Sequence, residues 1–494
     1  MEISEELKGK KVLITTFRNF SFVLHQELFI ANILARKGAE VYYVLDDGLL
    51  PHWDTYQIQE ISTPLNPSLC LKNKIVESIL TMAYRCKRLN KLYLSDFINT
   101  AFINENMIHL SEYDEKNCVS SVRRYFQCGK FDRDNIDHVE YYNLCRKNCI
   151  MVKMGIENII SQIQPDIGIT SHGIYSIWGS AYGVFQSHDI HTYIYGAHAY
   201  NSDTTFFTDT LCQTLTLDKD AQAYMNSNEF GEDEYKQINK YFADRRSHST
   251  KDTSIYYSWM NTIPKEKKNN EEKKNIPTFC LFTNIIWDGD VAQRDTIFDG
   301  MLMNTIYTIN KFRQLPYNLI VRIHPAEATL WKDSVKMNDI LHKEIPDIDS
   351  IPNVRIIDSS EPIDTYQFVK ENIDIALVYD GILSIELTAL KIPVIAAAVT
   401  RYANGDYVIS PKSIGEYNKW LENPGKCKLF LDEDKIFKMH KFAYWFIFKA
   451  GYTFPLFDDQ EFGKICFNDH NLAKMNSTKY TRFVNKLTNS VKNT

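Results

Sequence analysis

Residues 373–398 read IDIALVYDGILSIELTALKIPVIAAA, and this stretch decides the fold class. Its apolar run over 373–379 predicts a strand, the turn at Asp380-Gly381 opens a helical pattern, and 393–398 predicts a second strand. A strand, a helix and a strand in this order place the two strands parallel in one sheet. The stretch therefore predicts an α/β domain in which ligands bind at the carboxyl ends of the strands.

Similar apolar runs predict strands in both halves of the chain. They lie at 10–17, 40–45, 167–170 and 191–196 in the first half, and at 278–284, 318–323 and 354–358 in the second. The sequence therefore predicts an α/β fold of two Rossmann-like, doubly wound domains facing a cleft, which suits a nucleotide in one domain and a second substrate in the other. The predicted divisions are 1–228 for an N-terminal domain with a helical insertion, 229–276 for a charged helix and linker, 277–433 for a C-terminal domain, and 434–494 for helices that pack back on both domains.

The composition is that of a folded protein without a nucleic-acid partner. Of the 494 residues 44% are hydrophobic, and Asp and Glu outnumber Lys and Arg by 62 to 56, whereas nucleic-acid binders usually carry a basic excess. The sequence has no leader-like segment and no run of about 18 apolar residues, so we expect a cytoplasmic protein. The ten cysteines form no CxxC pair, and we expect reduced, buried thiols rather than a metal site.

The aromatic stretch KIFKMHKFAYWFIFKAGYTF at 435–454 has two interpretations. One is a helix packed across both domains, because its apolar residues surround most of the helix. The other is a basic and aromatic face that rests on a membrane surface. The second interpretation would add peripheral contact with the inner membrane face to the cytoplasmic location.

Polar side chains end two predicted strands of the second half. The side chains and backbone amides of Thr283 and Asn284 can hold a phosphate. His324 ends the next strand beside Arg322, and the proline after it keeps its backbone extended, so the imidazole can donate to a phosphate. Local backbone contacts would satisfy such a histidine as well, and both roles stay open.

A third group of polar residues runs from the end of strand 373–379 into a helix. It consists of Asp380, Gly381, Ser384 and Glu386. Gly381 permits close approach of a ligand to the backbone, the start of a helix favours an anion, and Glu386 can accept hydrogen bonds from a ribose. A plain helix cap with an acid in its first turn explains the same residues equally well.

No familiar phosphate-binding or hydrolase motif is present. The sequence lacks GxGxxG, GxxxxGK[ST], GxSxG and HExxH, which argues against simple dehydrogenases and P-loop ATPases. Asp288 and Asp290 form a DxD that can hold a divalent metal, although capping of a loop is the commoner role of such a pair.

The first half offers two candidates for a general base. His172 ends the strand 167–170 in the run Ser171-His172-Gly173 and could deprotonate a sugar hydroxyl. Glu27, with His25 beside it near the start of the first predicted helix, is the second candidate. A histidine at a strand end is more often structural, so neither residue alone identifies the base.

Several segments, taken together, resemble bacterial capsule and surface polysaccharide biosynthesis proteins. They are SVRRYF (121–126), SHGIYSIWG (171–179), FTNIIWD (282–288), LIVRIHPAE (319–327), SSEPIDTYQF (359–368) and YDGILSIELTALKIPVIAA (379–397). The resemblance implies a glycosyltransferase of the two-Rossmann-domain GT-B type, related to Kdo and sialic acid transferases, with an acceptor domain followed by a nucleotide-sugar domain. Lys391 stands where a glycine is common in this group, and Gly381 where a serine is common.

The resemblance also implies roles for single residues. His324 would contact the donor phosphate, Gly381, Ser384 and Glu386 the phosphate and ribose, and Ser359 and Ser360 the base or ribose. The predicted catalytic residues are His172, Glu27 and His324, and the predicted donor-binding residues are Thr283, Asn284, Arg322, His324, Ser359, Ser360, Asp380, Gly381, Ser384 and Glu386. The resemblance implies no cofactor and no requirement for Mg²⁺, and it favours an inverting reaction.

The predicted activity is transfer of a sugar from a nucleotide-sugar donor to a glycan or glycolipid hydroxyl in surface polysaccharide synthesis. The donor would be linked to CMP, UDP or GDP. Two alternatives stay open: a non-catalytic nucleotide-sugar-binding subunit of a polysaccharide assembly complex, and a sugar epimerase on the same fold.

Overall fold

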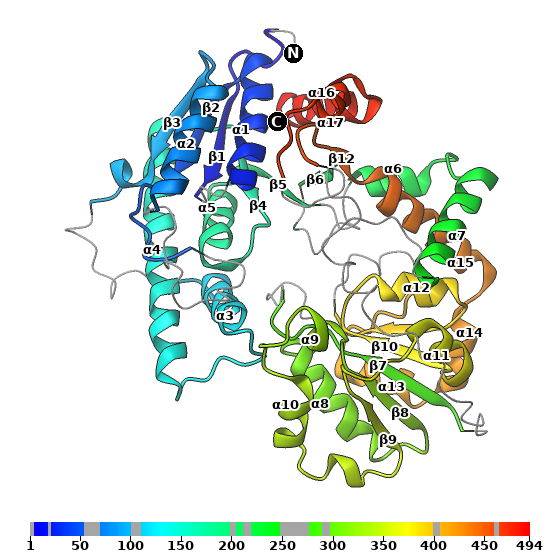
Figure 1. Ribbon diagram of the computed structural model, residues 1–494. Coiled ribbons are helices and arrows are strands. Elements are labelled where there is room, and N and C mark those ends of the chain that lie inside the picture. The colour runs from blue at the N-terminus through cyan, green and yellow to red at the C-terminus, as the bar shows by residue number, and fades with distance from the viewer. Residues whose placement is uncertain are drawn as a thin grey trace. The chain divides into compact units, whose positions relative to one another are not determined.

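The computed structural model describes residues 4–17, 21–53, 70–99, 110–197, 204–209, 211, 219–247, 276–288, 297–398, 406–458 and 464–494. The chain divides into two compact units, which Figure 1 shows with their elements labelled. The first unit contains Met1–Phe126, Phe131–Cys212 and Gly451–Thr494, and the second contains Gln127–Lys130 and Gln213–Ala450.

In the first unit, seven strands of the described chain form one sheet in the order β12-β6-β5-β4-β1-β2-β3. The strands are β1 (Lys11–Thr16), β2 (Glu40–Leu45), β3 (Leu89–Tyr93), β4 (Ile167–Ser171), β5 (His191–Ala197), β6 (Thr204–Thr208) and β12 (Tyr452–Thr453). Strands β1 to β5 pair in parallel, whereas β6 pairs antiparallel with β5 and β12 antiparallel with β6. The central parallel strands β1 and β4 are buried along almost their whole length, whereas the edge strand β3 is only partly buried.

The helices of the first unit follow the sheet strands in chain order. They are α1 (Ser21–Arg36), α2 (Leu71–Ala83), α3 (Glu112–Phe126), α4 (Ile136–Ile163), α5 (Ser180–Ser187), α16 (Asp469–Ala473) and α17 (Thr478–Lys492), with the 3₁₀ turns η2 (Leu94–Phe97) and η10 (Lys474–Asn476) and the π-helical turn η5 (Tyr175–Gly179). Helix α1 packs on α2 and α17, and its apolar residues share one core with Phe454, Phe457 and Phe483 from the end of the chain.

In the second unit, five strands of the described chain form a parallel sheet in the order β11-β10-β7-β8-β9. The strands are β7 (Thr278–Phe282), β8 (Asn318–Arg322), β9 (Val354–Ile357), β10 (Ile375–Val378) and β11 (Val394–Ala396). The helices are α6 (Lys219–Asn226), α7 (Glu232–Arg246), α8 (Gly300–Phe312), α9 (Ala326–Thr329), α10 (Met337–Glu344), α11 (Thr365–Asn372), α12 (Leu383–Ala389), α13 (Ile414–Leu421), α14 (Pro424–Phe430) and α15 (Glu433–Tyr444), with the turns η8 (Ile348–Ser350) and η9 (Trp445–Lys449).

The predicted α/β class with two separate, mainly parallel sheets is confirmed. The three predicted domain boundaries and the cleft stay predictions. The stretch 434–494 is divided between the units, since residues up to Ala450 belong to the second and those from Gly451 to the first. Helix α7, from the predicted linker, packs on α15 within the second unit, and the rest of that linker, 248–275, lies outside the described residues.

Helix α15 and the turn η9 bury most of their apolar side chains. Met439, Phe442, Ala443, Phe446 and Ile447 are all 3% exposed or less. For residues 435–449 the structure therefore supports the interpretation of a packed helix, and this helix offers no continuous apolar face to a membrane. Among the described helices, none is both long and apolar enough to cross a membrane.

Candidate functional site

Two consecutive residues after β7 connect the carboxyl ends of three neighbouring strands in the second unit. The backbone N–H of His324, after β8, donates to Oγ1 of Thr283 at 3.0 Å. Nδ2 of Asn284 donates to the carbonyl of Asp380, after β10, at 2.8 Å, and its Oδ1 accepts from the Asp380 N–H at 3.5 Å. Four of the predicted site residues therefore lie together at one edge of the sheet, where parallel sheets bind ligands.

The local contacts of His324 fix the protonation of its ring. Nδ1 accepts a hydrogen bond from the backbone N–H of Ala326 at 3.1 Å. Burial, with a smaller contribution from the neighbouring Arg322 charge, lowers the pKa of His324 to about 4. The ring is therefore neutral at pH 7 with its proton on Nε2, and that N–H is a donor that needs no protonation of the ring.

Arg322 organises the loop after β9 rather than pointing into solvent. It is 3% exposed, and its guanidinium donates to the carbonyls of Asp358 and Glu361, the latter at 3.2 Å. Within this loop the hydroxyl and the N–H of Ser360 donate to Oδ1 of Asp358 at 2.6 and 2.9 Å. Arg322 thus holds the segment that carries Ser359 and Ser360 beside the end of β8.

The turn between β10 and α12 needs a glycine at one position. Gly381 has φ +133°, a conformation that side chains with a Cβ rarely adopt. Its carbonyl accepts from the hydroxyl of Ser384 at 2.8 Å, and its N–H donates to Oδ1 of Asp380 at 2.7 Å. Asp380 and Ser384 therefore shape the turn around Gly381, and their predicted contacts with a donor stay predictions.

Glu386 is engaged inside the second unit. It is 4% exposed, and its carboxylate accepts hydrogen bonds from Nε of Arg245 and from the hydroxyl of Tyr366, the latter at 2.9 Å. Arg245 is equally buried at 3%. A carboxylate has about four acceptor positions, so a ribose contact would use the remaining ones. The predicted ribose contact stays a prediction, whereas the buried ion pair is a structural role that the sequence did not indicate.

Glu327 has no predicted role although it ends the run LIVRIHPAE. It is 2% exposed, and its Oε2 accepts from the backbone N–H of Met337 at 3.0 Å. Burial raises the pKa of Glu327 to about 7. A carboxyl group that titrates near neutral pH three residues from His324 was missed because spacing along the sequence does not report burial.

His172 lies in a strained turn of the first unit. Three residues after β4 have positive φ: His172 at +50°, Gly173 at +69° and Tyr175 at +70°. The hydroxyl of Ser171 lies 2.6 Å from Nδ1 of His172, and the imidazole stacks on Trp178 with ring centroids 5.4 Å apart. At His172 and Tyr175, which carry a Cβ, such a backbone conformation costs about 1–3 kcal/mol each and persists where surrounding contacts enforce it.

One face of α3 provides those contacts. The residues involved are Tyr113, Asn117, Ser121 and Arg124, which recur at the spacing of a helical face. Their side chains contact the carbonyl of Gly173, the N–H groups of Tyr175 and Ser176, and the hydroxyl of Tyr175. The runs SVRRYF and SHGIYSIWG, far apart in the sequence, are therefore in direct contact.

Glu27 and His25 are core residues of α1 in this structure. Glu27 is 1% exposed and accepts from the hydroxyl of Tyr195. His25 is fully buried among Phe29, Tyr84, Phe454, Phe457 and Phe467, with ring centroids 5.4 to 6.4 Å away. Burial lowers the pKa of His25 to about 4. A histidine with this environment is a packing residue, and the base role of Glu27 stays a prediction.

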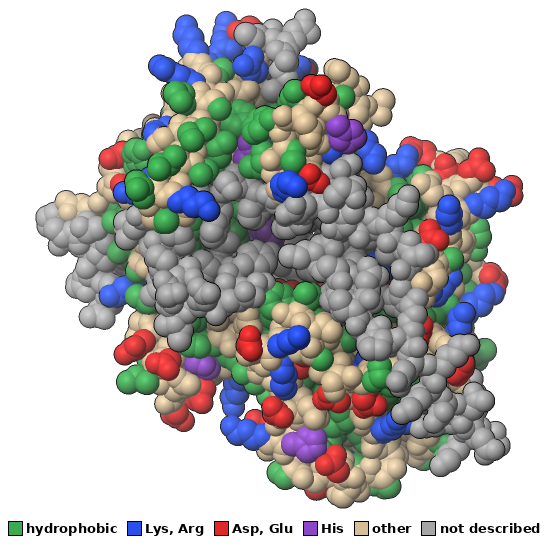
Figure 2. All heavy atoms as spheres, viewed as in Figure 1, with side chains coloured by type: hydrophobic (Ala, Val, Ile, Leu, Met, Phe, Trp, Pro, Cys, Tyr) green, Lys and Arg blue, Asp and Glu red, His purple; other side chains and the backbone are tan. Residues whose placement is uncertain are grey.

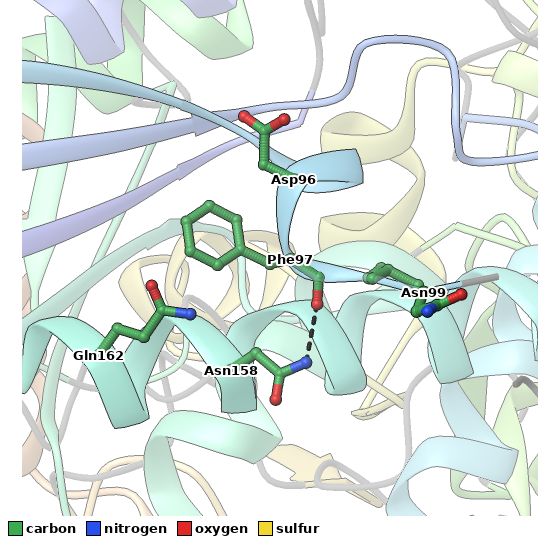
Figure 3. A pocket seen from close by; sticks show the side chains of 6 residues that line it. Asp96, Phe97, Asn99, Asn158 and Gln162 are labelled. Atoms are coloured by element: carbon green, nitrogen blue, oxygen red, sulfur yellow. Dashed lines mark hydrogen bonds between the residues drawn. The ribbon is translucent and has the colours of Figure 1, made fainter.

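A surface depression of the first unit lies apart from these residues. Its volume is about 470 Å³, and Asp96, Phe97, Ile98, Asn99, Asn158 and Gln162 line it between η2 and α4 (Figure 3). The amide of Asn158 is used to hold the Phe97 carbonyl at 2.7 Å. None of the predicted site residues contributes to this depression.

The DxD is only partly described. Asp288 is exposed, and Asp290 lies outside the described residues. Within the described part of the chain, no three His, Cys, Asp or Glu side chains gather closely enough to hold a metal ion.

Sequence comparisons give no relative, and structural comparisons give distant ones. No protein-family model matches the sequence, and no curated protein matches it. Among solved structures, a β-Kdo 2,4 transferase, KpsC of Thermosulfurimonas dismutans, is similar over 66% of this chain and 87% of its own, with 11% identity and a TM-score of 0.36. UDP-GlcNAc 2-epimerase of Neisseria meningitidis, bound to UDP-GlcNAc, is similar over 89% and 100%, with 10% identity and a TM-score of 0.25.

The calicheamicin glycosyltransferase CalG4 is similar over 90% of this chain and 95% of its own, with 9% identity and a TM-score of 0.25. Identities and TM-scores this low transfer no activity to this chain. The family expected from the residues, and the function it implies, therefore rest on the residues themselves.

Proposed function

We propose that this protein is a glycosyltransferase that moves a sugar from a nucleotide-sugar donor to a hydroxyl group of a glycan or glycolipid. The observation that carries the proposal is the group at the sheet edge of the second unit. There Thr283 and Asn284 connect the ends of β8 and β10, and the neutral ring of His324 holds a proton on Nε2.

These residues at the sheet edge would form the donor site and stabilise the phosphate that leaves. In the transfer step the acceptor oxygen bonds to the anomeric carbon of the sugar, and the bond from that carbon to the phosphate oxygen breaks. The nucleotide leaves with its negative charge, which the Nε2–H of His324 and the backbone around Gly381 can stabilise. A preorganised neutral donor works here without any change of protonation during the step.

The acceptor hydroxyl must lose its proton to a base. His172 is the stronger of the two first-unit candidates, because its strained turn is fixed by α3 and its ring lies against Trp178. Glu27 is almost fully buried, so a substrate would reach it only after a local rearrangement. We therefore assign the base to His172 and keep Glu27 as the alternative.

Donor binding is tested first with a thermal-shift panel of CMP, CDP, UDP, GDP and their sugars, with Mg²⁺ and with EDTA. A ligand that binds the native state raises the melting temperature by mass action. A shift with one nucleotide identifies the donor class, and an equal shift in EDTA supports metal independence. The absence of any shift would overturn the donor site at Thr283, His324 and Gly381.

Turnover is then tested with His324→Ala, His324→Gln and, as a matched control, His342→Ala. His342 lies half-buried on α10 of the same unit, where its ring contacts the Asn338 carbonyl and the Asp349 carboxylate. Loss of one preorganised donor should lower kcat at least about 100-fold with a smaller change in donor affinity, and Gln should restore part of it because it keeps an N–H. Near-normal turnover in folded His324→Ala would contradict the proposal.

Product analysis separates the alternatives. A new glycoside with release of the nucleotide supports a transferase, whereas an inverted sugar still linked to its nucleotide indicates an epimerase. Nucleotide-sugar binding without any product, in the presence of a mixed glycolipid extract, would favour the non-catalytic subunit.

A further inference from the structure

Helix α2 exposes an apolar stripe on the face opposite its contact with α1. Leu71, Ile75, Ile79 and Met82 are 72%, 50%, 54% and 71% exposed, and their spacing of four, four and three places them along one side of the helix. The opposite side holds the buried Leu80. A helix of a folded protein usually turns its apolar side to the core, so α2 has a second apolar face without a partner in the described chain.

This stripe is a cluster rather than ordinary scatter. Fifteen large hydrophobic side chains are exposed among the described residues, and four of them lie on this one helix of 13 residues. Others, such as Ile136 and Leu429, are not part of such a stripe. Figure 2 shows hydrophobic side chains gathered on the part of the first unit where Figure 1 labels α2. Contiguous exposed apolar patches mark interaction surfaces, whereas isolated ones need no explanation.

The surroundings of the stripe are strongly basic. Residues 71–91 contain Lys72, Lys74, Arg85, Lys87 and Lys91, as well as Arg88, whose charge is paired with Glu5 at 2.9 Å, although the whole chain has a net charge of -6. The single acid of this segment, Glu77, is buried and accepts a hydrogen bond from Tyr93. Lys72 and Lys74 are exposed within the first turn of α2. The outward side of the helix therefore combines apolar side chains with positive charge and carries no acid.

We propose that α2 binds the surface of an anionic lipid bilayer, lying parallel to it with the stripe inserted among the acyl chains and the basic residues at the lipid headgroups. An apolar stripe flanked by Lys and Arg is what an interfacial helix needs, and about 20 Å of helix lies along the surface. A second copy of this chain fits less well, because two such faces would bring their basic residues together. The inference does not depend on the proposed glycosyl transfer.

The test is co-sedimentation of the full chain with vesicles of phosphatidylcholine, with and without phosphatidylglycerol. The wild type should pellet with the anionic vesicles and remain in solution with phosphatidylcholine alone, and high salt should weaken binding through screening. Ile75→Gln/Ile79→Gln and Lys72→Gln/Lys74→Gln should each weaken binding at least about tenfold, because the first removes inserted apolar surface and the second removes headgroup attraction.

The matched control is Ile136→Gln/Leu429→Gln, which removes two exposed apolar side chains outside α2. It should bind like the wild type, and all variants should keep the wild-type melting temperature because the changed side chains are exposed. Equal binding by wild type and Ile75→Gln/Ile79→Gln, or no binding to anionic vesicles, would overturn the proposal. So would a dimer, measured by light scattering, that this variant converts to a monomer, since the stripe would then be a contact between copies.

Discussion

Acid should destabilise the first unit through His25, and the size of the effect follows from its burial. The folded pKa is about 4 because the ring is enclosed by aromatic side chains. The unfolded chain protonates His25 near pH 6.5, so the unfolded state binds more protons between these two values. The stability that the neutral ring of His25 contributes is therefore fully present above about pH 7 and is lost as the pH falls toward 4.

The magnitude can be worked from these two pKa values. Between pH 7.5 and pH 5.0, linkage through one histidine with this shift removes about 2 kcal/mol from the free energy of unfolding. The full loss, below pH 4, is about 3.4 kcal/mol at 1.36 kcal/mol per pKa unit. His324 and His440 have lowered pKa values as well and add to the loss in the wild type.

The assay is urea unfolding, followed by circular dichroism, at both pH values. The informative variant is His25→Leu/Tyr84→Phe, because Tyr84 donates to or accepts from the imidazole at 3.0 Å and would otherwise keep an unmatched hydroxyl. On acidification, the free energy of unfolding of this variant should fall by about 2 kcal/mol less than that of the wild type. The single variant Tyr84→Phe keeps His25, so its free energy of unfolding should fall on acidification by as much as that of the wild type.

Equal losses in the wild type and the double variant would refute the reasoning. His25 would then titrate near its ordinary pKa in the folded protein, which a fully enclosed ring cannot do. That result would reopen the assignment of His25 as a packing residue and strengthen the α1 candidates for the general base.

Two further predictions concern single side chains. Glu386→Gln leaves the buried guanidinium of Arg245 without its anion and should lower the free energy of unfolding in urea by about 3–5 kcal/mol. The pair replacement Arg245→Met/Glu386→Leu should recover most of this loss. A loss below about 1 kcal/mol in the single variant would contradict the buried ion pair. Gly179→Ala should lower the free energy of unfolding by about 1–3 kcal/mol, since the new Cβ would lie 2.5 Å from the Asn117 amide. The control Gly425→Ala has no atom within 4 Å of its new Cβ and should be neutral or stabilising by about 0.5 kcal/mol. Equal melting temperatures of these two alanine variants would refute the close contact.

The central strands could be predicted from the sequence because they are buried on both faces. The runs 10–17 and 373–379 correspond to the interior strands Lys11–Thr16 and Ile375–Val378, in which every residue except Lys11 is buried. Strand β3 was missed because an edge strand of sequence LNKLY carries polar residues. Strand β12 was missed because its partner β6 lies about 250 residues earlier and only two residues pair.

The candidate site was predictable in its positions and not in its contacts. Strand ends identified His324 and Asp380, because the carboxyl edge of a parallel sheet follows from the strand order. The partner of Glu386 is Arg245, 141 residues away, and no local pattern announces it. The positive φ of His172 had no signal beyond the glycine that follows, since the strain is enforced by α3 from another part of the chain.

In the sequence, the residues that form the whole second sheet lie between two parts of the first unit. Strand β12 and the side chains of Phe454, Phe457 and Phe483 complete the first sheet and the core around α1. During synthesis the ribosome therefore makes the second unit before it makes the last pieces of the first. While some 240 residues are added, the apolar core residues of the N-terminal half lack these last contacts. A chaperone that shields exposed apolar surface would act on the N-terminal half in that interval.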